Sequence, residues 1–133
     1  MSIANLQEKL LFFTRQKSRI NNQLSNIQMQ QLTATRKSTT SQMAYNEQLQ
    51  NLYYDPEVGY GTPEYTEILV ELQSDHEFEM ASLTAWESQL EAQKEAFETQ
   101  LNEVQNYENS WQKLLANNIK VEFTYGGSGG GNK

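Results

Sequence analysis

The sequence predicts an all-α protein: a long antiparallel helical hairpin that forms a coiled coil, followed by a short β-prone segment and a flexible Gly-rich tail. Two stretches repeat apolar residues at alternating steps of three and four, which is typical of helices that pack along a narrow seam. A cluster of turn-forming residues separates them. Only 37% of the 133 residues are hydrophobic, and this favours a thin seam over a thick core. We therefore expect a hairpin over residues 1–118, a β-prone segment over 119–125 and a tail over 126–133.

The first helix is expected over about 3–52, with Ser2 as its N-cap. Its apolar pattern is strong as far as Ile27 and then fades through a polar stretch between Thr33 and Gln42. Thr and Ser are moderate helix formers, so the helix is least strongly specified there. The expected seam comprises Ile3, Leu6, Leu10, Phe13, Lys17, Ile20, Leu24, Ile27, Gln31, Ala34, Ser38, Ser41, Tyr45, Gln48 and Leu52.

The stretch 53–62 is the expected tip loop, because it combines Pro, Gly and Asp between two helical patterns. Tyr53, Tyr54 and Tyr60 make this tip unusually aromatic. Exposed aromatic rings at a loop tip can form a contact surface for another protein. They can equally pack the loop onto the ends of the two helices, and the sequence leaves both interpretations open.

The second helix is expected over 63–118. Thr62 is a favourable N-cap, Pro63 suits the first helical position, and Glu64 and Glu67 lie where the helix dipole favours acids. No Gly or other Pro interrupts the stretch. The expected seam comprises Tyr65, Leu69, Leu72, His76, Glu79, Leu83, Trp86, Leu90, Gln93, Phe97, Gln100, Val104, Tyr107, Trp111 and Leu114.

Pairing the two seams position by position predicts an antiparallel register with several apolar layers. Examples of its pairs are Leu10 with Tyr107, Ile20 with Phe97, and Ser41 with His76. Charge supports the pairing, since residues 1–54 carry a formal charge of +4 and residues 55–133 carry −11. Opposite charges on adjacent helices attract, although each surface pair contributes only about 0 to 1 kcal/mol.

From Ile119 to Tyr125 the apolar period changes to two, because Ile119, Val121, Phe123 and Tyr125 alternate with polar residues. Such alternation predicts a short strand, whose backbone groups need a partner outside a two-helix hairpin. We expect either strand pairing with another chain, or a segment that frays or lies along the helices. Residues 126–133 have the composition of a flexible linker.

Residues that could support catalysis are sparse, so we expect no enzyme, cofactor or metal site. The sole histidine, His76, is expected to be a hydrogen-bonded seam residue, since Met80 stands where a zincin helix needs its second histidine. Glu71, Asp75 and Glu79 share a helix face that could hold a cation weakly, although a solvated acidic face is the ordinary interpretation. There is no phosphate-binding glycine loop, and the acidic balance argues against nucleic-acid binding.

The chain contains no cysteine, and its longest N-terminal apolar run, at residues 10–13, is too short for a signal peptide or a membrane span. We therefore expect no membrane span, no disulfide and no thiolate site. The expected location is the cytoplasm, or outside the cell by a route that leaves no cleaved signal.

In layout, residues 1–118 resemble subunits exported by flagellar or type III-like machines. The features that carry this resemblance are the absence of cysteine, helices rich in Gln, Asn, Ser and Thr, a polar N-terminus that begins Met1-Ser2-Ile3, and a short hairpin loop. It implies a small helical subunit that polymerises into needles or filaments, or that caps or chaperones them. Two other hairpin classes differ in detail. The small WXG-type secreted dimers have a tryptophan in the turn, where this chain has Gly59-Tyr60-Gly61, and prefoldin-like subunits do not have their strands after the second helix.

The sequence thus indicates a non-enzymatic structural protein whose partner is protein and whose expected state is a homo-oligomer in a filament or secretion-type apparatus. The alternative is an intracellular coiled-coil adaptor or chaperone for a protein partner. Neighbouring hairpins are expected to pack on apolar residues beside the seam, namely Leu11, Phe12, Leu32, Phe78, Leu101 and Leu115. The residues predicted to carry self-association are Phe12, Phe78, Ile119, Val121, Phe123 and Tyr125, and the predicted tip residues are Tyr53, Tyr54 and Tyr60.

Overall fold

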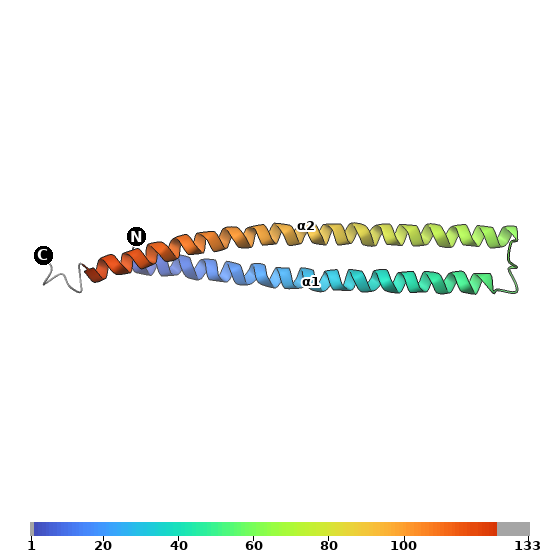
Figure 1. Ribbon diagram of the computed structural model, residues 1–133, viewed down its shortest axis with the longest axis horizontal. Coiled ribbons are helices and arrows are strands. Elements are labelled where there is room, and N and C mark those ends of the chain that lie inside the picture. Colours follow the sequence, from blue (N-terminus) through green and yellow to red (C-terminus); the bar gives the residue numbers. More distant parts are fainter. Residues whose placement is uncertain (1, 125–133) are drawn as a thin grey trace. The chain divides into compact units, whose positions relative to one another are not determined.

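The computed structural model describes residues 2–124, which form two helices and no strand (Figure 1). Helix α1 spans Ile3–Tyr53 and helix α2 spans Pro63–Glu122. This confirms the predicted helical hairpin. The described residues divide into two compact units, of which unit 1 combines residues 2–26 with 94–124 and unit 2 comprises residues 27–93. In each unit a segment of α1 lies beside a segment of α2.

Both helices begin at the predicted caps. The Asn5 amide donates to Ser2 Oγ over 3.2 Å, and the Tyr65 amide donates to Thr62 Oγ1 over 3.2 Å. These bonds satisfy amide groups that the first turn of a helix leaves without partners. The polar stretch of α1 is helical as well, and the hydroxyls of Thr33, Thr35 and Thr39 donate over 3.0–3.1 Å to the carbonyl oxygens four residues earlier.

The tip loop of unit 2 turns the chain between α1 and α2. Asp55 Oδ1 accepts a 2.9 Å hydrogen bond from the Glu57 amide, as in an Asx turn. Gly59 and Gly61 have φ angles of 74° and 82°, which only glycine adopts without strain. The Thr62 hydroxyl lies 2.9 Å from the Val58 carbonyl oxygen, so this residue ties the loop to the start of α2.

The α1 seam agrees closely with the prediction. Of its fifteen predicted positions only Gln48 is exposed, and the half-buried Leu49 takes its place. The buried apolar side chains of α1 are Leu6, Ile20, Ile27, Ala34 and Leu52.

The predicted α2 seam is wrong at five positions, because Glu79, Gln93, Gln100, Tyr107 and Leu114 are exposed. In each case the buried or half-buried residue is the next one along the helix. The buried positions from Leu90 to Leu115 still alternate by steps of four and three residues. The 3.5-residue period is therefore kept, and only the order of the two steps is reversed relative to the prediction. The residues that face α1 instead are Met80, Lys94, Leu101, Glu108 and Leu115.

The predicted register is also wrong, by about one helical turn. Tyr107 stacks on Phe13 with ring centroids 6.0 Å apart in unit 1, where the prediction was Leu10. His76 stacks on Tyr45 at 3.9 Å in unit 2, where the prediction was Ser41. A register chosen for apolar layers placed Lys17 opposite Gln100, whereas in the structure Lys17 reaches a carboxylate.

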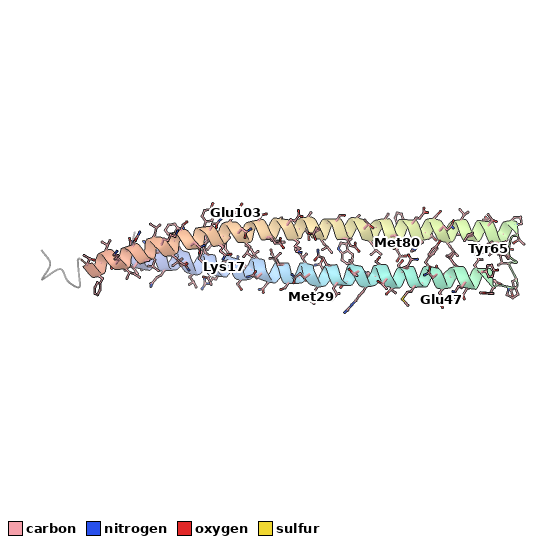
Figure 2. All side chains as sticks on the ribbon, viewed as in Figure 1. Lys17, Met29, Glu47, Tyr65, Met80 and Glu103 are labelled. Carbon is pink, nitrogen blue, oxygen red and sulfur yellow. The ribbon has the colours of Figure 1, made fainter. Side chains whose placement is uncertain are left out.

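That carboxylate belongs to Glu108, which is one of the few buried polar residues of the described chain. Lys17 Nζ lies 2.8 Å from Glu108 Oε1, and Figure 2 labels Lys17 on α1. The Thr14 hydroxyl lies 3.3 Å from Glu108 Oε2. Within residues 2–124 this is the one ion pair that joins basic and acidic residues, so the charge asymmetry of the two halves is largely not used in pairing the helices.

The β-prone segment predicted for 119–125 is wrong over its described part. Ile119 and Val121 lie in α2, and Phe123 lies in a wider helical turn that follows it. The helix continues because nothing between Asn118 and Thr124 breaks it, and no strand in residues 2–124 is present to pair with. Tyr125 and the tail 126–133 lie outside the described residues.

Neither helix has, in residues 2–124, a stretch apolar enough over sufficient length to cross a membrane.

Candidate protein–protein interface

The predicted contact residues fall at four separate places. Phe12 belongs to unit 1 and Phe78 to unit 2. Ile119 and Val121 lie at the C-terminal end of α2 with Phe123 directly after it, and Tyr53, Tyr54 and Tyr60 lie at the tip. Only a cluster of exposed apolar groups indicates a contact surface, so the neighbours of each residue decide its interpretation.

Phe12 is part of an aromatic cluster that crosses both helices of unit 1. Its side chain is 53% exposed, and its ring meets Phe13 edge-on with centroids 5.6 Å apart. Phe13 in turn stacks on Tyr107 of α2, which is 58% exposed. Leu114, seven residues after Tyr107 and on the same helix face, is also exposed. These four residues form what we call the aromatic face: Phe12, Phe13, Tyr107 and Leu114.

Of these four residues, the sequence predicts only Phe12 as a contact residue. The predicted seam includes Tyr107 and Leu114, but both are exposed. Leu101 and Leu115 are predicted to lie beside the seam, but both are half-buried within it. The signal that identifies the correct seam is Lys17, because a basic residue at a seam position needs an acidic partner and Glu108 directly follows Tyr107. Moving Glu108 into the seam moves Tyr107 out of it.

A groove lies beside the aromatic face between the two helix segments of unit 1. It has a volume of about 420 Å³ and is lined by Phe13, Ile20, Val104 and Tyr107 together with polar residues. Among the polar residues are Arg19 from α1 and Glu103 from α2. Both are exposed, and neither forms an ion pair within residues 2–124.

Phe78 is 77% exposed, but its neighbours on the helix surface are Ser74, Asp75, Ala81 and Ser82. It therefore stands alone, and single exposed apolar side chains are common on soluble proteins.

The end of α2 exposes Ile119, Val121 and Phe123. Every described residue after Asn118 is exposed, because within unit 1 the end of α2 extends past the start of α1 (Figure 1). These side chains have no facing helix in residues 2–124, and Val121 continues the row of Tyr107 and Leu114.

The tip tyrosines contact one another. Tyr53 meets Tyr54 and Tyr60 edge-on, both with ring centroids 4.9 Å apart, and Tyr60 meets Tyr65 at 5.1 Å. Tyr65 is half-buried at the start of α2. The rings thus pack the loop onto the helix ends, while Tyr54 and Tyr60 remain largely exposed.

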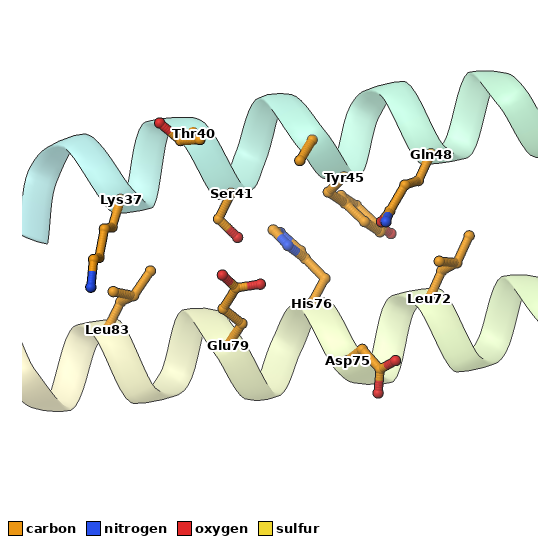
Figure 3. Close-up of a pocket in the computed structure, with 11 residues that line it drawn as sticks. Lys37, Thr40, Ser41, Tyr45, Gln48, Leu72, Asp75, His76, Glu79 and Leu83 are labelled. Carbon is orange, nitrogen blue, oxygen red and sulfur yellow. The ribbon is translucent and has the colours of Figure 1, made fainter.

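A second groove, of about 520 Å³, lies where the seam of unit 2 is polar (Figure 3). His76 stacks on Tyr45 and lies 3.2 Å from Gln42 Oε1, as expected of a hydrogen-bonded seam histidine. Ser41 and Glu79 point toward one another from the two helices (Figure 3). Ser41 is buried, and its hydroxyl has no hydrogen-bond partner among the described residues. Within the same residues no three His, Cys, Asp or Glu side chains are placed to share a metal ion.

Comparisons with protein families, with curated proteins and with solved structures find no match to this chain.

Proposed function

We propose that this chain is a non-enzymatic structural protein that associates with copies of itself, as a subunit of a filament or secretion-type apparatus. The observation that carries the proposal is the aromatic face of unit 1, where Phe12 and Tyr107 are more than half exposed although their rings are linked through Phe13. Burying a phenylalanine side chain completely contributes about 1.5–3 kcal/mol, so leaving such a cluster in water is unfavourable unless another chain covers it.

A second apolar surface supports extended assembly. This surface comprises Ile119 and Val121 at the end of α2 and Phe123 directly after it, all of which are exposed. A chain with two different contact surfaces can join more than one neighbour, and contacts that do not close on themselves produce filaments. The alternative function, an adaptor or chaperone, uses the same apolar surfaces to hold a different protein.

Light scattering coupled to size exclusion, over a wide concentration range, tests the proposal. We expect the mass of the wild-type chain to rise with concentration. We expect Phe12→Ser to weaken association, so that its mass rises less with concentration than that of the wild type. We expect Phe123→Ser to lower the largest mass that the protein reaches. Met29→Ser, at a 68% exposed apolar residue of unit 2, is the matched control and is expected to behave like the wild type.

Circular dichroism of each variant checks that its helix content is unchanged. A wild-type chain that stays monomeric at all concentrations would overturn the self-association proposal. A stable complex that forms only when another protein is added would favour the adaptor.

A further inference from the structure

The groove of unit 1 carries opposite charges on its two walls. Arg19 comes from α1 and Glu103 from α2, and both line the groove beside Phe13 and Tyr107. Each is exposed and lacks an ion-pair partner within residues 2–124. A groove with one basic wall, one acidic wall and an apolar floor is complementary to a second copy of itself that is rotated by 180° about an axis parallel to the helices.

We propose that this groove and the aromatic face form an isologous interface with a second copy of the chain, related by a two-fold axis that runs along the helices. This inference rests on the proposed self-association and specifies the surface through which two copies first associate. Around such an axis the unit 1 segments of two copies make a four-helix bundle in which α1 of each copy packs against α2 of the other.

The direction of the axis follows from the charges. A two-fold axis along the helices exchanges the left and right walls of the groove, so Arg19 of each copy meets Glu103 of the other. An axis across the helices at the height of the groove would place α1 on α1, and Arg19 would then face its own equivalent. Like charges brought together at an interface are unfavourable, so the first arrangement is selected.

The apolar residues satisfy the same symmetry. Phe12 lies on the α1 side of the aromatic face, and Tyr107 and Leu114 lie on the α2 side. Exchanging the two sides brings Phe12 of each copy toward Tyr107 and Leu114 of the other. The arrangement also makes every pair of neighbouring helices antiparallel, as in up-down-up-down bundles. It also places the basic first helix of one copy against the acidic second helix of the other, so opposite charges attract between the copies. Within one chain, residues 2–124 form only one such ion pair.

Charge reversal tests this interface on the full-length chain. Arg19→Glu alone places two acids together in the homodimer, and Glu103→Arg alone places two arginines together. We expect each variant to self-associate at least about tenfold more weakly than the wild type. An equimolar mixture of the two variants restores both opposite-charge contacts, so we expect it to form a heterodimer, detected by native mass spectrometry through the variants' different masses.

The mixture separates contacts between chains from contacts within one chain, because an attraction within a chain would not be restored by mixing. The control mixes Lys9→Glu with Glu98→Arg, an exposed pair outside the groove, and is expected to show no preference for heterodimers. If both groove variants associate as strongly as the wild type, or if their mixture forms no heterodimer, the interface is wrong while self-association stands. If the wild type is monomeric throughout, both the interface and the proposed function are wrong.

Discussion

At the scale of single residues, the polar groups of the seam show how differently two buried side chains are accommodated. Glu108 has a cationic partner in Lys17, at 2.8 Å, and a nearby hydroxyl from Thr14. Ser41, equally buried, has no partner among the described residues. A buried polar group without a hydrogen bond reduces the stability of the fold.

We therefore expect Ser41→Ala to raise the free energy of unfolding by about 1 kcal/mol, because it removes the cost of desolvating the hydroxyl. Urea unfolding followed by circular dichroism measures the change. Ser18→Ala, at an exposed position of the same helix, reports how much of the gain comes from helix propensity alone. A clear loss of stability would show that the Ser41 hydroxyl is hydrogen-bonded in solution.

The ion pair leads to a second residue-level prediction. Lys17→Met leaves the Glu108 carboxylate buried without a cation, and we expect it to destabilise the chain by about 1–3 kcal/mol. Adding Glu108→Leu removes that carboxylate, and the double variant is expected to recover most of the loss. Urea unfolding of the single and double variants measures these free energies of unfolding. Additive losses would mean that the two side chains do not interact.

At the scale of elements, the tip loop depends on two glycines with left-handed backbone angles. A side chain at either position is strained, since the left-handed conformation costs an L-residue roughly 1–2 kcal/mol. The surroundings differ, however. A Cβ at Gly61 would meet nothing within 4 Å, whereas one at Gly59 would lie 3.3 Å from Thr62 Cγ2.

We expect Gly61→Ala to cost about 1 kcal/mol and Gly59→Ala to cost more, because the second also displaces the residue that caps α2. Thermal unfolding of the two variants gives the comparison directly. Equal losses would indicate that the contact with Thr62 relaxes without cost.

At the scale of the whole molecule, the chain turns back on itself within unit 2, where α1 packs against α2 of the same chain. The chain has no cysteine, so two can be introduced without interference. With Tyr45→Cys and His76→Cys we expect a short bismaleimide to cross-link the two positions within one chain, since the native rings are 3.9 Å apart.

Denaturing electrophoresis at low protein concentration separates the products of this reaction. A product of twice the chain mass, without the internal cross-link, would mean that α1 pairs with α2 of another chain. A pair of cysteines at Tyr45 and Met29, both on α1, is the control and should give no internal link.

The sequence by itself determined the two helices, their caps, the glycine-bearing loop and nearly the whole α1 seam, because helix propensity, capping residues and apolar spacing are local properties of the chain. The tertiary structure decided the register, the choice between Tyr107 and Glu108 for the α2 seam, and the helical state of residues 119–122. These depend on which groups face each other across the seam, where burying Lys17 requires a carboxylate. The aromatic face belongs to this second set, since Tyr107 reaches the surface only when Glu108 is turned toward Lys17.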